Sequence, residues 1–351
     1  MKKIISGFTL FFASIIGFAQ PQAYYNGIDF DLNGQPLKNV LATRITNTHT
    51  NNLSYGDVWV ALKVTDLNPS NSNQVMLIYG HTGVSSGKFS RVRAKNDNGG
   101  ANLEWNREHV FARSLGTPNL EQSIANADAH HVRSSDVQLN GDRGNKKFTS
   151  GSGNSGSVGS NWYPGDEWKG DVARMMMYMY LRYPTQCSPT NVAVGTIASS
   201  FDNMIGLFLQ WNAEDPVSQL EIQRNTYLAN ANNSAGQGNR NPFIDNPYLA
   251  TKIWGGPEAE DRWNIALSND NFDNIEFGIY PNPATDNKVN IQTSELINTI
   301  TIHSIDGKLI QQISNPQFEN NQFEINNLST GFYIITLKSD NKSTAKKLIV
   351  K

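Results

Sequence analysis

The stretch Trp105-Asn-Arg-Glu-His-Val-Phe-Ala-Arg113 places a carboxylate, Glu108, directly beside an imidazole, His109. Further along, Leu139-Asn-Gly-Asp-Arg143 presents an amide, Asn140. Hydrolysis of a phosphodiester needs a base for water and a cation beside the phosphate. An imidazole suits the base, and a carboxylate with an amide carbonyl suits a hard cation such as Mg²⁺. We therefore predict that Glu108, His109 and Asn140 share one site.

The motif around Asn140 also has a plainer interpretation. Asn140-Gly141 alone is typical of a hairpin turn. Ser134 or Ser135, however, could cap a helix that starts nearby and carries Asn140. We expect the helix.

Two neighbouring motifs leave alternatives open. We expect His130 and His131 in a strand, one pointing inward to make a hydrogen bond and the other outward. A second metal site through Asp128 and His130 is a less favoured alternative. Arg143 could contact the phosphate or the product, but a salt bridge with Asp142 or a contact at the helix end is equally open.

Together these motifs resemble those of the bacterial endonuclease I family. In that family a strand ends in Glu-His, a second strand carries Asp-x-His, and a helix presents Asn from Asn-Gly-Asp-Arg. Further blocks follow in the family's order, so that the resemblance spans most of residues 22–256: Trp168-Lys-Gly-Asp-Val-Ala-Arg174, Asp215-Pro-Val-Ser218 and Gln237-Gly-Asn-Arg-Asn-Pro-Phe243.

The resemblance implies an α+β nuclease domain with a ββα-metal finger and several helices. It implies a sequence-nonspecific endonuclease that hydrolyses DNA, with RNA as a second substrate. His109 would be the general base, Glu108 and Asn140 would hold one Mg²⁺ (Mn²⁺ or Ca²⁺ being alternatives), and Arg143 would assist catalysis. A metal-bound water would protonate the departing 3′ oxygen, leaving 5′-phosphates.

Charge indicates a local rather than a global nucleic-acid site. The formal net charge of the chain is −2, so no overall basic field attracts nucleic acid. Residues 88–147 nevertheless hold 10 basic and 7 acidic residues, an excess of positive charge around the motifs. Few phosphate contacts imply weak, weakly salt-dependent binding, which suits a degradative enzyme.

The N-terminus is typical of a secretory signal peptide over residues 1–19. Lys2 and Lys3 precede an apolar stretch, and the small Ala19 suits cleavage before Gln20. A single cysteine, Cys187, excludes an internal disulfide, and we interpret it as an incidental thiol and not a catalytic one.

Periodicity predicts the other elements of residues 22–265. Helices are expected over 57–64, 166–183 and 218–233, and a strand over 74–79. The Met-rich run Met175-Met-Met-Tyr-Met179 is interpreted as core packing. An acidic, polar linker is expected over residues 266–277.

The C-terminal residues 278–351 change to short alternating runs. Strands are expected over 288–292, 297–302, 308–313, 322–325, 332–337 and 345–350, which suggests a small all-β immunoglobulin-like sandwich. Three blocks resemble the sorting domain of the type IX secretion system: Tyr280-Pro-Asn-Pro-Ala-Thr-Asp286, Ser329-Thr-Gly-Phe-Tyr333 and Lys346-Lys-Leu-Ile-Val-Lys351. The resemblance implies a protein that is secreted or cell-surface, exported through the periplasm by that machinery.

Two other functions stay open at this point. A metal-dependent phosphodiesterase for small esters would normally need more Asp and His ligands, for two metals. A catalytically silent nucleic-acid-binding protein would not need Glu108, His109 and Asn140. We expect a monomer without a transmembrane segment in the mature chain.

Overall fold

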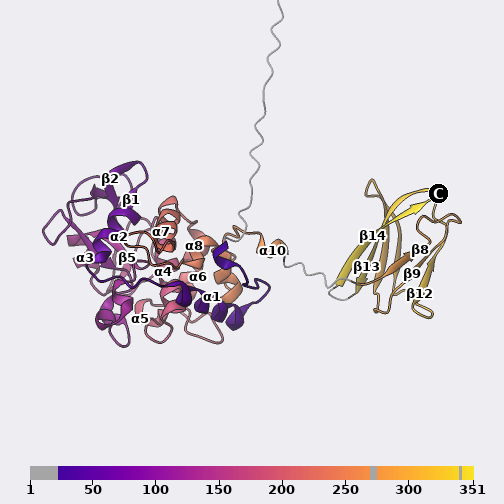
Figure 1. Cartoon of the computed structure of the whole chain (residues 1–351), viewed down its shortest axis with the longest axis horizontal. Coiled ribbons are helices and arrows are strands. Elements are labelled where there is room, and N and C mark those ends of the chain that lie inside the picture. Colours follow the sequence, from indigo (N-terminus) through magenta and orange to yellow (C-terminus); the bar gives the residue numbers. More distant parts are fainter. Residues whose placement is uncertain (1–22, 269–274, 340–341) are drawn as a thin grey trace, which may run out of the picture. The chain divides into compact units, whose positions relative to one another are not determined.

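The computed structural model describes residues 23–268, 275–339 and 342–351, so the expected signal peptide lies outside the described residues. The chain divides into two compact units between Ile265 and Ala266, each with its own hydrophobic core (Figure 1). Within the described ranges, no helix is long and apolar enough to cross a membrane.

The first unit combines helices with small antiparallel sheets. Its strands form sheets in the order β1-β2-β3, β4-β5 and β6-β7. The helices are α1 (Gly34–Thr48), α2 (Asp57–Thr65), α3 (Val137–Arg143), α4 (Lys169–Arg182), α5 (Pro189–Val192), α6 (Gly206–Glu214), α7 (Gln219–Ala229), α8 (Pro242–Asp245), α9 (Tyr248–Trp254) and α10 (Ile265–Ser268). The strands are β1 (Leu67–Asn68), β2 (Asn71–Met76), β3 (Val92–Ala94), β4 (Trp105–His109), β5 (Val132–Asp136), β6 (Gly156–Val158) and β7 (Asn161–Tyr163).

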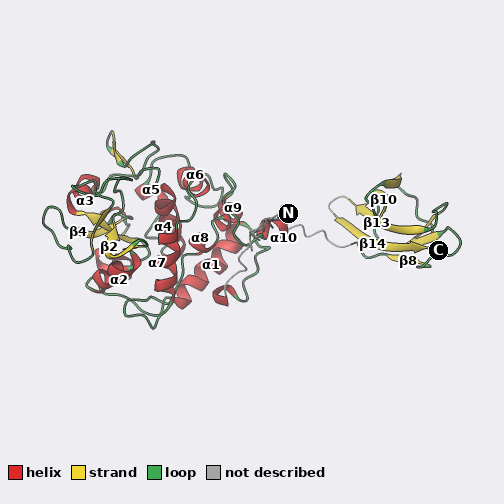
Figure 2. Cartoon of the chain, turned by 90° about the horizontal axis from the view of Figure 1, so that it is seen from above, coloured by secondary structure: helices red, strands yellow, loops and turns green. Residues whose placement is uncertain are grey.

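Helix α4 forms the centre of this unit and contacts α1, α6 and α8 (Figure 2). The methionines of its Met-rich run are all buried in the main core, which confirms their packing role. The helix starts at Lys169, later than predicted, and Trp168 is its N-cap residue.

The other sequence predictions hold in type and differ at their ends. Helix α2 runs one residue further than predicted, and α7 ends at Ala229 and not near residue 233. Ser218 caps α7 in a capping box with Glu221. Strand β2 lies earlier than predicted, and Tyr79 beyond it has φ of 69°. A left-handed conformation is incompatible with continuing the strand and is rare for a bulky residue.

Strand β5 pairs with β4 and leads directly into α3, and these three elements carry the sequence motifs. The two strands pair antiparallel, with Glu108 opposite Arg133 and His109 opposite Val132. Asn140 lies in a helix as predicted, but the predicted cap is wrong. Asp136 accepts hydrogen bonds from the first backbone N–H groups of α3, because β5 continues through both serines up to Asp136.

A buried ion network anchors β5 to the helices. Arg133 pairs with both Asp66 and Asp171, the latter on α4. Arg224 of α7 pairs with Asp66 as well. Arg174 pairs with Glu221 nearby. Buried charges are stable only when paired and hydrogen-bonded, so the blocks around residues 168–174 and 221–224 build the scaffold that holds the strand pair.

The second unit is all-β and contains two antiparallel sheets. One has the strand order β11-β10-β13-β14 and the other β12-β9-β8, and their buried side chains form one hydrophobic cluster. The strands are β8 (Gly278–Tyr280), β9 (Val289–Gln292), β10 (Thr299–Ser304), β11 (Leu309–Ser314), β12 (Gln322–Ile325), β13 (Gly331–Ser339) and β14 (Lys342–Val350). All six predicted strands are present.

Residues 269–274 of the expected linker over 266–277 lie outside the described residues. In its described part, Ile275 and Phe277 are buried in the core of the second unit. At the other end, Ile265 is buried in the first core and begins the short helix α10.

Candidate active site

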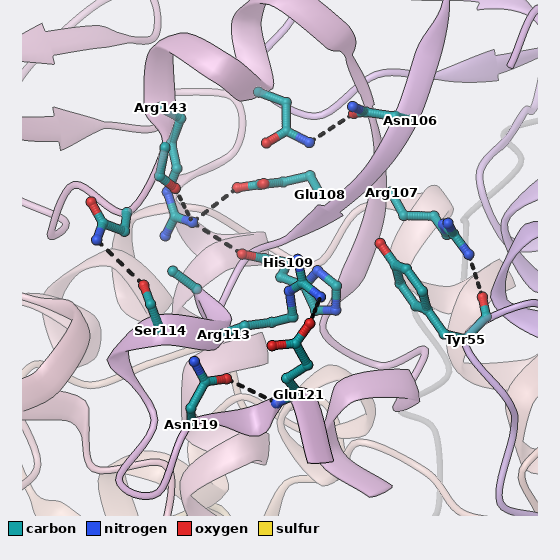
Figure 3. A pocket seen from close by; sticks show the side chains of 14 residues that line it. Tyr55, Asn106, Arg107, Glu108, His109, Arg113, Ser114, Asn119, Glu121 and Arg143 are labelled. Atoms are coloured by element: carbon teal, nitrogen blue, oxygen red, sulfur yellow. Dashed lines mark hydrogen bonds and ion pairs between the residues drawn. The ribbon is translucent and has the colours of Figure 1, made fainter. Parts of the chain in front are cut away.

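A pocket of about 580 Å³ lies beside the end of β4. Glu108, His109 and Asn140 all line it, so the structure brings together the three residues singled out in the sequence (Figure 3). Neighbouring strand residues point to opposite faces, so Glu108 and His109 can share a pocket only where the strand ends. The complete lining is Tyr55, Asn106, Arg107, Glu108, His109, Ala112, Arg113, Ser114, Asn119, Glu121, Asn140, Arg143, Gly144 and Asn145.

The Glu108 carboxylate is held in place through one of its two oxygens. Its Oε1 accepts a hydrogen bond from the Tyr79 hydroxyl at 3.1 Å and pairs with Nη1 of Arg143 at 3.1 Å. Its Oε2 has no hydrogen bond within the described part of the chain. Burial raises the pKa of Glu108 to about 7, against the opposing effects of Arg143 and Tyr79. An extra positive charge beside this carboxylate would favour its ionised form.

The Asn140 side chain is oriented by a partner on β4. Its Nδ2 donates to Oδ1 of Asn106 at 2.7 Å. This bond uses the nitrogen and leaves the carbonyl oxygen of Asn140 as an acceptor beside the pocket. Because Asn106 and Glu108 are two residues apart on β4, they lie on the same face of that strand.

The His109 imidazole is fixed as a neutral tautomer. Its Nε2 lies 2.8 Å from the carbonyl oxygen of Asn126, which can only accept, so Nε2 carries the hydrogen. The other nitrogen, Nδ1, then has a free lone pair. Burial, followed by the nearby His131, lowers the pKa of His109 to about 3. Tyr55 stacks on the ring, with centroids 5.3 Å apart.

Arg143 is completely buried and makes several interactions. Besides Glu108, it donates to the backbone oxygens of His109 at 3.0 Å and Val110 at 2.7 Å. The alternative salt bridge with Asp142 is wrong, because Asp142 pairs instead with Lys88 at the surface. These contacts tie the last residue of α3 to the end of β4, which positions the carboxylate and the imidazole.

Asp128, His130 and His131 form a second, closed cluster. Asp128 accepts from the hydroxyls of Tyr178 and Tyr183 and from Gln237, so both of its oxygens are engaged. Burial alone would raise the pKa of Asp128, but the histidines around it hold it below its usual value.

The expectation that His130 and His131 alternate in a strand is wrong. Both residues precede β5 in a turn, and both are buried. His130 Nε2 lies 3.2 Å from the Asn239 carbonyl and His131 Nε2 lies 2.8 Å from the Ala125 carbonyl. A turn imposes no two-residue alternation, so both rings can face the core. Within the described ranges, no group of three or more His, Cys, Asp or Glu side chains is arranged to hold a metal.

Cys187 is buried in the main core, and burial raises the pKa of its thiol. A thiol reacts as the thiolate, so this environment makes Cys187 unreactive, as the sequence suggested.

Four residues that shape the pocket carried no sequence signal. Tyr55 lines the pocket, and Tyr79 donates to Glu108, each from a distant part of the chain; Asn126 contributes only a backbone oxygen. Asn106 lies inside the first motif but supports Asn140 through a contact made only in the folded chain. Of these four residues, Tyr79 has a left-handed backbone conformation, with φ of 69°. Backbone strain of this kind is concentrated at functional sites.

A single hard cation fits the oxygens present. Oε2 of Glu108 and the carbonyl oxygen of Asn140 have no hydrogen bond from described residues, and both residues line the same pocket. Mg²⁺ commonly takes one or two protein oxygens and keeps waters and phosphate oxygens as its other ligands.

With the fold and the site defined, comparison identifies the class of protein. The family model for endonuclease I matches residues 33–248, and the chain belongs to that family. The model for a secretion system C-terminal sorting domain matches residues 278–351. The chain therefore joins a secreted nuclease to a type IX secretion signal.

Particular relatives agree with this class. The chain is 38% identical over 247 residues to the extracellular ribonuclease of Bacillus subtilis, covering 68% of this chain and 80% of the relative. It is 38% identical over 246 residues to the extracellular ribonuclease of Bacillus amyloliquefaciens, covering 67% and 79%. Among solved structures, PorZ, a surface component of the type IX secretion system of Porphyromonas gingivalis, matches 21% of this chain and 11% of its own at 18% identity. Its TM-score of 0.19 is too low to relate the folds.

Proposed function

We propose that this nuclease hydrolyses phosphodiester bonds of DNA and RNA without sequence preference, using one divalent cation and His109 as the general base. The observation that carries the proposal is the pocket that Glu108, His109 and Asn140 share. We further propose that β4, β5 and α3 act as a ββα-metal finger, and that the C-terminal unit is an immunoglobulin-like sandwich.

His109 is suited to accept a proton from water. Its Nε2–H is committed to the Asn126 carbonyl, so Nδ1 is the basic atom. The lowered pKa keeps the ring neutral, with Nδ1 unprotonated, at neutral pH. Water loses a proton to Nδ1 as its oxygen attacks phosphorus. The bond from phosphorus to the 3′ oxygen breaks, and this oxygen takes up a proton from water, which gives a 3′-hydroxyl and a 5′-phosphate.

Glu108 and Asn140 are the proposed cation ligands. When bound, Mg²⁺ supplies Lewis-acid stabilisation of the charge that develops on the phosphate and the leaving oxygen. The residues themselves keep two oxygens at fixed positions: Tyr79 and Arg143 hold Glu108, and Asn106 holds Asn140. We assign Arg143 to positioning, and direct contact with the phosphate stays a prediction.

Both DNA and RNA are proposed as substrates because water is the nucleophile. A mechanism of this kind does not use the 2′-hydroxyl group of the substrate. Both Bacillus relatives are called extracellular ribonucleases, which supports RNA as a substrate of this chain.

A nuclease assay tests the proposal directly. Supercoiled plasmid and a structured RNA are incubated with the purified protein in Mg²⁺, and in a matched reaction with excess chelator. We expect nicking and then degradation of the plasmid, degradation of the RNA, no preferred cleavage sequence, and no reaction with the chelator. Intact substrates across several divalent metals, with folded protein, would contradict the proposal. Cleavage of small diesters alone would instead support the phosphodiesterase alternative, and binding without cleavage a silent binding protein.

A further inference from the structure

Two arginines that the proposed mechanism does not use line the same pocket. Arg107 belongs to β4, and Arg113 begins the short 3-10 helix Arg113–Leu115. Figure 3 shows Arg113 near His109 and the Tyr55 ring between His109 and Arg107. A pocket that places two arginines next to a base and a proposed cation site presents positive charge where an anionic chain would pass.

The Arg107 guanidinium is held in place without a carboxylate. It lies 3.5 Å from the centre of the Tyr55 ring and 4.3 Å from that of Trp59, and it donates to the Tyr55 backbone oxygen. Within the described residues it forms no ion pair, and its Nε has no hydrogen-bond partner. Aromatic rings fix the plane of the guanidinium while its charge stays uncompensated.

Arg113 is only loosely paired. Its one carboxylate partner in the described chain is Glu121 at 3.5 Å, and the two side chains are 40% and 59% exposed. Exposed pairs of this kind are weak, so an anionic ligand can replace Glu121. The Arg113 guanidinium lies 5.8 Å from the centre of the Tyr55 ring, on which Arg107 also packs, so both cations lie beside the same aromatic side chain.

The position of Arg107 along β4 indicates which phosphate it would meet. Arg107 and His109 are two residues apart on β4, so their Cα atoms are about 6.6 Å apart along the strand. That distance is comparable to the spacing of consecutive phosphates along a nucleic-acid strand. Both side chains contact the Tyr55 ring. A nucleic-acid strand with its scissile phosphate at His109 would carry the neighbouring phosphate toward Arg107.

We propose that Arg107 and Arg113 form a subsite for the phosphate next to the scissile one, so that the enzyme favours oligonucleotide chains over small phosphodiesters. The subsite rests on the proposed function, because that function places the scissile phosphate at His109. Tyr55 contacts both Arg107 and His109, so it fixes the position of Arg107 relative to the proposed base.

Binding tests the subsite independently of catalysis. Arg107→Gln and Arg113→Gln are compared with wild type and with Arg44→Gln, a change on α1 outside the pocket. Fluorescence anisotropy measures the affinity for a labelled single-stranded DNA and for an RNA of the same sequence, in chelator, over a salt series. We expect each pocket variant to bind both oligonucleotides about 5- to 10-fold more weakly, and the slope of log K against log salt to become shallower by about 0.7. Arg44→Gln should match wild type.

Kinetics separate the subsite from the reacting centre. For a short oligonucleotide, the pocket variants should raise KM about 5- to 10-fold and change kcat much less. Hydrolysis of bis(4-nitrophenyl) phosphate, which has no second phosphate, should fall far less than hydrolysis of the oligonucleotide. Equal losses on both substrates, or an affinity and salt slope like those of wild type, would overturn the subsite.

The controls keep the two proposals distinguishable. If Arg107→Gln unfolds because Arg107 packs on Tyr55, the more exposed Arg113→Gln still tests the loss of charge. If wild type hydrolyses no substrate, the proposed function fails, whereas the binding measurement still decides whether the arginines hold a phosphate chain.

Discussion

Two clusters in the first unit contain the same kinds of side chain but differ in what they leave free. In one, Glu108 and His109 line a pocket, and each keeps an atom without a hydrogen bond from described residues. In the other, Asp128 and His130 are buried, and Asp128 has both oxygens engaged by tyrosines and Gln237. Residue types alone do not distinguish a reactive cluster from a structural one. Access and unused hydrogen-bonding capacity do.

Replacing the proposed base should have the largest effect. His109→Ala should lower kcat on plasmid and RNA by about 10²- to 10⁴-fold, because general base catalysis contributes that much. Steady-state rates measured with equal amounts of folded protein check this. A variant that retains more than a tenth of wild-type kcat would remove His109 from the role of base.

Replacing the centre of the closed cluster should change stability and not chemistry. Asp128→Ala leaves the hydroxyls of Tyr178 and Tyr183 and the Gln237 amide without their buried acceptor, which should lower the free energy of unfolding by about 3 kcal/mol or more. Denaturant unfolding measures the loss. Asp142→Ala, at an exposed ion pair, is the matched control and should change stability by less than about 0.5 kcal/mol. If Asp128→Ala abolished activity in a fully stable protein, the assignment of a purely structural role to the Asp128 cluster would be wrong.

The capping box gives a smaller and purely local effect. Ser218 accepts from the Glu221 backbone N–H, and Glu221 accepts from that of Ser218. Ser218→Ala should therefore lower the free energy of unfolding by about 1 kcal/mol without changing the KM for nucleic acid. Thermal unfolding and nuclease kinetics on the same sample check both parts, and a raised KM would link α7 to substrate binding.

Deletion of the C-terminal unit should have no effect on catalysis. The two units have separate cores, so a chain ending near residue 268 should keep its specific activity. The sorting domain directs type IX secretion, so in a native host the truncated protein should accumulate in the periplasm. Cell fractionation with activity assays measures this. Normal release into the medium would contradict the export role, and loss of specific activity would contradict the independence of the units.

The sequence predicted those parts of the site that are local in the chain. The sequence predicts that Glu108, His109 and Asn140 share one pocket because each lies in a short motif. It predicts α4 and the C-terminal strands because their periodicity spans many residues. The cap of α3 was missed because the end of β5 depends on its pairing with β4.

The rest of the site depends on contacts between distant parts of the chain. Tyr55 and Tyr79 contact His109 and Glu108 only after α2 and β2 pack beside the strand pair. The burial of His130 likewise follows from contacts with Tyr178 of α4 and the Asn239 carbonyl after α7, and that of His131 from contacts with His109 and the Ala125 carbonyl. No spacing in the sequence encodes such contacts.

Calorimetric titration of Mg²⁺ tests the central assignment, that Glu108 and Asn140 hold the cation while His109 serves as the base. The titration compares wild type with His109→Ala, Glu108→Ala and Asn140→Ala, each shown to be folded. We predict that His109→Ala binds Mg²⁺ like wild type although it is inactive. The other two should bind about 10-fold or more weakly, and added Mg²⁺ should partly restore their activity. An equal loss of affinity in all three variants, or no loss in any of them, would contradict the account.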